Sequence, residues 1–169
     1  TPGMGNDCPL PPSAELTITE IWSGNANGDN LTSDWFEITN MGDIAWVSGA
    51  DLDLFYDDES QDPNSATPIE GITTIGAGES VVVLIGSEAD ITEFTSLWSG
   101  DYDLNGVEIG YTNGAGLGGG GDAVTLFVGE PSLETIKDVA TYPAVSNGAS
   151  YDIILDAFSQ AGVGTEQAG

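Results

Sequence analysis

The segment Asp34–Asn40 alternates between two kinds of side chain with a period of two residues. Phe36 and Ile38 fall on one face, whereas Trp35 and Glu37 fall on the other. Successive side chains of an extended strand point to opposite faces, so this period is typical of a strand with one face in a core. The pattern therefore predicts a half-buried β-strand.

An earlier strand is predicted over Leu16–Trp22, where the alternation is less regular. Leu16 and Ile18 share one face, but Ile21 falls on the other face of a regular strand. A β-bulge inserts one extra residue into one strand of a pair. We therefore expect a bulge near Glu20.

Further apolar segments predict the rest of a β-rich domain. Val81–Ile85 is an unbroken apolar run, which is typical of a central strand buried on both faces. Six glycines between Gly114 and Gly121 do not form a phosphate-binding loop, because no Lys with Ser or Thr and no helix follow them. They suggest a close backbone approach or a flexible turn. Other strands are predicted over Ile44–Val47, Leu52–Tyr56, Ile69–Ile75, Val124–Val128, Ile136–Tyr142 and Tyr151–Leu155.

One helix is expected after Ser87. Ser87 can cap it, and Asp90 lies three positions later, as in a capping box. Ile91, Phe94 and Trp98 then recur at helical spacing. This apolar stripe is expected to pack on the sheets.

The charge of the chain is strongly one-sided. It has 28 acidic side chains, one basic side chain (Lys137) and no histidine, which gives a net charge of −27. Such a surface repels nucleic acid and disfavours anionic membranes. Two explanations stay open: solubility in a salty or extracellular medium, and the collection of divalent cations by some of the carboxylates. No apolar run is long enough to span a bilayer.

The residue inventory excludes the common catalytic sets. Without histidine, a serine or cysteine triad of the usual kind and a histidine-ligated metal are absent. The only cysteine is Cys8, so the chain has no internal disulfide and no cysteine-based zinc site, and the thiol either stays idle or pairs between molecules. A carboxylate pair remains as a hydrolase alternative. We expect no enzyme activity.

The chain contains, in this order, the stretches ITEI…DWFEITN, LDLFYD, IGAGESVVVLIG and GGDAVTLFV. Together they resemble the lamin tail domain of the type found in bacterial secreted proteins, over residues 15 to 142. The resemblance implies an immunoglobulin-like fold and a binding or assembly module with no catalytic signature. With the predicted helix, the expected fold class is all-β: an immunoglobulin-like antiparallel β-sandwich with one short helix.

The best candidate metal site begins at Asp101. Oxygen-bearing side chains at positions 1, 3 and 5 and a glycine at position 6 match the start of an EF-hand-type calcium loop. The match fails at position 12, where Thr112 stands in place of glutamate. An Asx-rich turn without metal is the alternative. The expected Ca²⁺ ligands are Asp101, Asp103, Asn105, Val107 through its carbonyl, and Glu108.

Three parts of the chain are predicted. Residues 1–14 form an extended proline-rich arm, because prolines at this density prevent a helix and discourage central strands. Residues 15–156 form the lamin-tail-like sandwich, and residues 157–169 form a C-terminal tail. The chain starts at Thr1 without a signal peptide, as a processed exported protein does, so a secreted, extracellular location is expected.

These observations lead us to expect a non-catalytic extracellular structural protein. It would self-assemble as a homo-oligomer or homopolymer, in a filament or layer, through its terminal arms, with calcium as a candidate bridge and strand addition at a sheet edge as the joining chemistry. The alternative is a calcium-dependent carbohydrate- or protein-binding accessory module of a larger secreted protein. Trp35 is an interface contact, a carbohydrate platform or a sheet-packing residue. The expected assembly residues are Cys8, Pro9, Leu10, Pro11, Pro12 and Trp35.

Overall fold

The computed structural model of the chain describes residues 13–24, 33–49, 52–100, 103–145 and 149–159. Its strands are β1 (Leu16–Trp22), β2 (Asp34–Asn40), β3 (Trp46–Val47), β4 (Leu54–Asp57), β5 (Thr67–Pro68), β6 (Thr74–Ile75), β7 (Ser80–Ile85), β8 (Ile109–Thr112), β9 (Gly121–Val128), β10 (Ile136–Pro143), β11 (Tyr151–Asp152) and β12 (Ala157–Phe158). Its helix is α1 (Asp90–Trp98).

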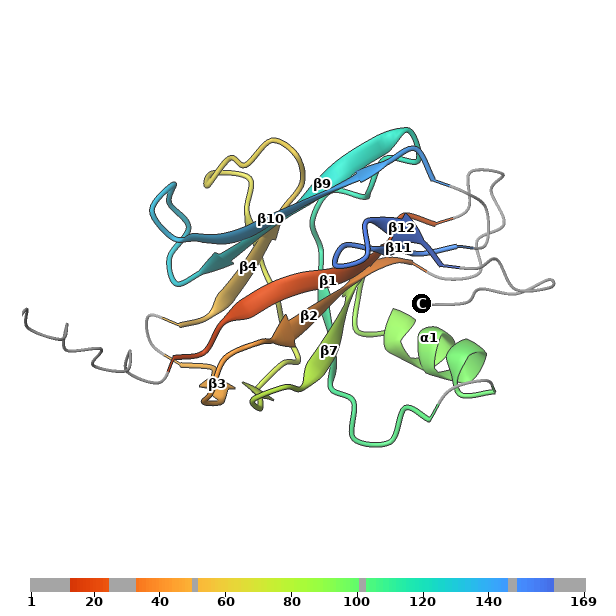
Figure 1. The fold of residues 1–169 in the computed structure, drawn as a ribbon, viewed down its shortest axis with the longest axis horizontal. Helices are drawn as coiled ribbons and strands as arrows, with labels where there is room; N and C mark the ends of the chain where they lie inside the picture. Colours follow the sequence, from red (N-terminus) through yellow and green to blue (C-terminus); the bar gives the residue numbers. More distant parts are fainter. Residues whose placement is uncertain (1–12, 25–32, 50–51, 101–102, 146–148, 160–169) are drawn as a thin grey trace, which may run out of the picture.

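The strands form two main sheets (Figure 1). One sheet has six strands in the order β12-β11-β1-β2-β7-β8, and the other has four in the order β10-β9-β4-β5. A small ribbon pairs β3 with β6. The predicted all-β sandwich with one short helix is therefore confirmed.

The first two strands have the bounds that the alternation predicts. β1 pairs with β2, and the register shifts between Ile18 and Glu20. This shift confirms the predicted bulge. It also brings Ile21 into the same buried cluster as Leu16 and Ile18. The bulge thus explains why the apolar residues of β1 do not alternate regularly.

The main core lies between the two sheets. Ile18, Phe36 and Val83 enter it from the six-stranded sheet, and Tyr56 and Leu126 enter it from the four-stranded sheet. The rings of Phe36 and Tyr56 stack with their centroids 5.4 Å apart. Fully burying an aliphatic or aromatic side chain of this size stabilises a fold by about 1.5–3 kcal/mol. Phe36 and Tyr56 therefore contribute directly to holding the two sheets together.

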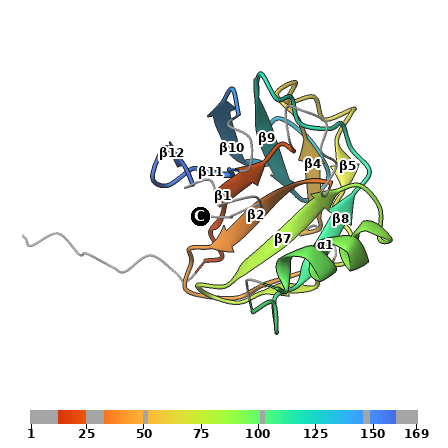
Figure 2. The same cartoon turned by 90° about the vertical axis from the view of Figure 1, so that its right-hand side faces the viewer.

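Helix α1 covers the outer face of the six-stranded sheet (Figure 2). Trp98 makes edge-to-face contacts with Trp22 at 6.3 Å and with Trp35 at 5.8 Å between centroids. The predicted apolar stripe of the helix does pack on the sheet, and β7 is buried on both sides, as its unbroken apolar run predicts. The N–H and hydroxyl of Ser87 both donate to the Asp90 carboxylate, at 2.6 and 3.0 Å. The helix itself begins at Asp90, with Ala89 at the N-cap position and no side-chain capping bond, so the expected cap at Ser87 is wrong.

Several sequence expectations differ from the structure, among them the strand expected over Tyr151–Leu155, of which β11 holds only the first two residues. Ile69–Ile75 was expected to be one strand, but β5 ends before it and β6 holds only its last two residues. Gly71, with φ +86°, turns the chain between these short strands, in a conformation that favours glycine. Near the C-terminus, β12 pairs with β11. β12 lies within residues 157–169, which were expected to form a tail. The sandwich therefore extends into that segment.

One pairing departs from the antiparallel pattern. β7 and β8 are parallel neighbours, and α1 is part of the connection between them. Two parallel neighbouring strands need a long crossover connection, which is most often a helix. Here α1 is part of that crossover. Within the described residues, no helix is long and apolar enough to cross a bilayer.

Candidate functional site

The predicted calcium loop is only partly described, because Asp101 lies outside the described residues. Within the loop, the backbone N–H and the side-chain amide of Asn105 donate to one oxygen of Asp103, at 3.1 and 2.6 Å. Gly106 has φ +86°, so the sharp turn expected at this glycine is present. The N–H of Val107 donates to the Leu104 carbonyl at 3.2 Å. These contacts form the Asx turn that the sequence left as the alternative.

Glu108 is engaged elsewhere. Its carboxylate accepts bonds from the N–H and hydroxyl of Thr73 and from the N–H of Thr74, at 2.9, 2.7 and 3.2 Å. Partial burial raises the pKa of Glu108, but these hydrogen bonds outweigh it and hold the pKa below its usual value. Glu108 thus ties the start of β8 to β6. The described residues contain no group of three or more candidate ligands that could hold a metal ion, and Ca²⁺ stays a prediction.

The expected assembly residues divide into two groups. Cys8, Pro9, Leu10, Pro11 and Pro12 lie outside the described residues. Trp35 is described, and only 2 % of it is exposed, because α1 lies over it. Sheet packing is therefore its role in this structure. This corrects the expectation that Trp35 belongs to an assembly surface.

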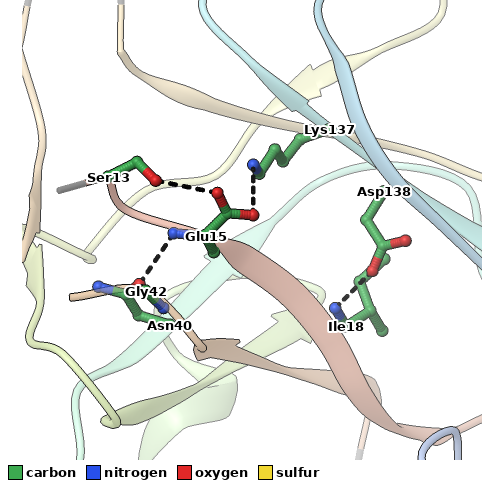
Figure 3. A network of polar contacts seen from close by, with 7 residues as sticks. All are labelled: Ser13, Glu15, Ile18, Asn40, Gly42, Lys137 and Asp138. Carbon is green, nitrogen blue, oxygen red and sulfur yellow. Dashed lines mark hydrogen bonds and ion pairs between the residues drawn. The ribbon is translucent and has the colours of Figure 1, made fainter. Parts of the chain in front are cut away.

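A buried amide fixes the point where β1 begins (Figure 3). Asn40 is fully buried at the end of β2, and its oxygen accepts the N–H groups of Glu15 and Gly42, each at 3.0 Å. Its amide nitrogen donates to the carbonyls of Ile44 and Ile75 at 2.8 and 2.9 Å. A buried polar group with four partners holds its neighbours in one arrangement. No sequence pattern marks Asn40 beyond its place at the end of a predicted strand, because two of its four partners, Glu15 and Ile75, come from distant parts of the chain.

An apolar groove of about 380 Å³ opens beside this point. Its walls include Ile44, Val47 and Leu52, which are 46 %, 54 % and 47 % exposed. Large apolar side chains that are half exposed and grouped around one hollow are typical of a contact surface. The lining residues are Ala14, Leu16, Ile44, Ala45, Trp46, Val47, Leu52, Val128 and Lys137. We call this feature the N-terminal groove.

Beside the N-terminal groove, the edges of β1 and β10 are only partly paired with other described strands. β1 pairs with β11 only through Glu20 and Ile21, so no described strand pairs with Leu16–Ile18 on the side opposite β2, although β10 of the other sheet contacts β1. In the described part of the chain, β10 likewise pairs with β9 alone. The Asp138 carboxylate accepts the Ile18 N–H at 2.8 Å between these two edges (Figure 3). One backbone donor of the edge is thus satisfied by a side chain.

Lys137 stands at the rim of the N-terminal groove. Its ammonium lies 3.7 Å from the Glu15 carboxylate, and both side chains are partly exposed (Figure 3). A pair of this kind contributes little to stability, because water competes for both charges. The lysine therefore remains accessible to another carboxylate. It is the only basic residue of the chain.

A second, polar hollow of about 430 Å³ lies on the outer face of the six-stranded sheet. It includes Glu20 and Glu37, two carboxylates in mid-strand, where an unpaired charge is usually avoided. The Thr19 hydroxyl donates to Glu37, and the Ser150 hydroxyl donates to Glu20. A hydroxyl group on the neighbouring strand β1 and one just before β11 thus help the sheet to accommodate these acids. Thr39, Asp152, Ile154 and Leu155 complete the lining.

The glycine-rich segment 114–121 is held from several sides. The Tyr56 hydroxyl donates to the Ala115 carbonyl at 2.8 Å, and the Asp34 carboxylate accepts the Leu117 N–H at 2.8 Å. Burial raises the pKa of Tyr56 well above its usual value, so it stays a neutral donor. A Cβ on Gly114 would come within 2.6 Å of the Tyr56 ring. This confirms the close backbone approach that the glycine run suggests.

Comparison of the chain with protein-family models, with curated proteins and with solved structures found no match. The resemblance to the lamin tail domain therefore stays a prediction.

Proposed function

We propose that this chain is a non-catalytic extracellular structural subunit that assembles with copies of itself through its terminal segments. The observation that carries the proposal is the N-terminal groove. It lies beside Ser13, where residues 1–12 join the sandwich, and its apolar walls are about half exposed. An apolar hollow beside partly paired sheet edges supports a role in holding another polypeptide.

The charge of the chain shapes how such subunits associate. Two copies of a subunit with a net charge of −27 repel each other at low ionic strength. Salt shortens the range of this repulsion, to a Debye length of about 8 Å at physiological ionic strength. Assembly is therefore expected to strengthen as salt is added, and a divalent cation bound between acidic surfaces would strengthen it further.

Negative-stain imaging with light scattering at rising concentrations of the full chain tests the proposal. We expect polymers in physiological or higher salt. A chain that stays monomeric at high concentration under those conditions contradicts the proposal.

Calcium is tested separately, by repeating the measurement with added Ca²⁺ and with a chelator. We expect fewer or shorter polymers in the chelator. Assembly that is unchanged in the chelator removes calcium from the proposal and leaves the remainder intact.

The polar hollow on the outer sheet favours a second candidate, an accessory module that binds sugar or protein. Glu37 and Asp152 supply acceptors there, beside Ile154 and Leu155, which are 60 % and 74 % exposed. A monomer that binds a glycan or protein, and loses binding on Glu37→Gln, supports this candidate. Glu88→Gln, which lies just before α1 and outside the lining of the hollow, is the control.

A further inference from the structure

We propose that the N-terminal groove is the receptor for residues 1–12 of a second copy of the chain. The inference rests on the proposed function and identifies the surface through which two copies join. Three observations carry it: the position of the groove, the chemistry of residues 1–12, and the spacing of their prolines.

The position of the groove links it to the N-terminal segment. Ala14 and Leu16 line the groove, and the Ser13 carbonyl accepts the Asp43 N–H at 3.1 Å. The hydrogen bonds of Asn40 hold this junction in place. In each copy, the residue to which the N-terminal segment is joined therefore lies at the same end of the sandwich as the groove. Two copies that meet end to end bring each segment close to the other copy's groove.

The residues of the segment complement the groove. Residues 1–12 read TPGMGNDCPLPP, with Met4 and Leu10 as large apolar side chains and Asp7 as the single charge. The groove offers apolar walls with a single charge, the ammonium of Lys137. In a chain with 28 acidic residues, this lysine is the one side chain that attracts a carboxylate. The segment thus matches the groove both in its apolar side chains and in the sign of its charge.

The prolines also suit an apolar site. Pro9, Pro11 and Pro12 carry no backbone N–H. A buried N–H without an acceptor is costly, so a segment with few N–H groups enters an apolar groove at a lower cost than an ordinary one.

The same prolines favour a second copy over the chain's own segment. A proline-rich stretch prefers the extended polyproline II conformation, which rises about 3.1 Å per residue. Residues 9–12 are therefore expected to project by about 12 Å from Ser13 before the chain can turn. The groove begins at Ala14, and we expect so stiff a stretch not to fold back at Pro11 and Pro12 to place Leu10 of the same chain in it. Leu10 of a neighbouring copy has no such constraint.

Disulfide trapping between two different chains tests the proposal, and the single native cysteine makes this possible. One chain is the natural sequence, whose only thiol is Cys8. The other carries Cys8→Ser and Val47→Cys, so its only thiol lies on the groove wall. Any disulfide between the two chains then joins an N-terminal segment to another copy's groove. The matched control replaces Val47→Cys with Leu155→Cys, which lies in the polar hollow and is 74 % exposed.

We expect the heterodimer at position 47 to form about tenfold faster than the control, because docking raises the effective concentration of the two thiols. A second groove variant, Leu52→Cys, should behave like Val47→Cys. Both side chains are about half exposed, so neither change removes a core contact. Equal rates at positions 47, 52 and 155 in chains that still assemble overturn the assignment of the groove and leave the proposed function standing.

The single variant Val47→Cys, which keeps Cys8, separates the two possible sources of the segment. If it closes into a cyclic monomer while the two-chain mixture gives no heterodimer, the groove binds its own segment and the proposal is wrong. Sedimentation of the same samples reports on assembly itself. Chains that remain monomeric in all mixtures contradict the proposed function as well.

Discussion

The glycine-rich segment offers a matched pair of substitutions that tests the packing of the sandwich. We predict that Gly114→Ala destabilises the fold and that Gly120→Ala does not. A Cβ at position 114 would lie 2.6 Å from the Tyr56 ring and 2.7 Å from the Thr67 hydroxyl. A Cβ at position 120 would meet no atom within 4 Å.

The size of the effect follows from how firmly Tyr56 is held. Its ring is fully buried, stacks on Phe36, and donates its hydroxyl to the Ala115 carbonyl. Forcing an extra methyl group into such a core costs about 1–3 kcal/mol, and loss of the hydrogen bond adds about 0.5–1.5 kcal/mol. Gly114→Ala should therefore cost about 2–4 kcal/mol. Gly120→Ala should be neutral or stabilise by up to about 1 kcal/mol, because alanine restricts the unfolded chain.

Thermal unfolding, followed by circular dichroism, measures both variants. For a chain of 169 residues, each kcal/mol shifts Tm by about 2–4 °C. Gly114→Ala should then lower Tm by roughly 4–16 °C, while Gly120→Ala stays close to the natural chain. Equal Tm values for the two variants would refute the assigned contact. A large loss in both would mean that the whole run needs glycine for its backbone conformation.

Two further predictions concern the core and the partly buried carboxyl group of Asp34. Trp98→Ala should lower the free energy of unfolding by about 3–5 kcal/mol, since it leaves a cavity between α1 and the sheet. In the same denaturant titration, Ser96→Ala on the exposed side of α1 should change it by no more than about 0.5 kcal/mol. Similar losses in the two variants would contradict the buried role of Trp98. Burial raises the pKa of Asp34 above its usual 3.8, and the Leu117 N–H only partly opposes this. The folded state thus holds the proton more tightly, so this group's contribution to stability falls as pH rises from 3.8 through the raised pKa. Asp34→Asn should gain in urea midpoint relative to the natural chain across that window, and a difference that does not change with pH would contradict the shift.

The sequence predicts those elements whose signal lies within a few neighbouring residues. The alternation of Asp34–Asn40 defines β2, and the apolar run of Val81–Ile85 identifies β7 as central. The helical spacing of Phe94 and Trp98 correctly places a helix on the sheet. The prediction failed at Ile69–Ile75, because a single left-handed glycine divides that apolar stretch.

Features that depend on distant contacts could not be predicted in this way. The parallel pairing of β7 with β8 follows from the path of the chain through α1. Trp35 appeared to point outward, since its strand alone does not show that a helix covers it. The N-terminal groove joins Leu16, Trp46 and Val128 from separate strands. No local pattern marks such a site, although the solitary Lys137 is a signal in so acidic a chain.

The central claim is that residues 1–12 join one copy of the sandwich to the next. Sedimentation velocity of the full chain and of a chain that begins at Ser13 tests it most directly. The shorter chain keeps the contacts of Ser13, Glu15 and Asn40, so it should fold with an unchanged Tm. The account predicts that it sediments as a monomer in salt where the full chain forms polymers. A shorter chain that polymerises as readily as the full chain would contradict the account.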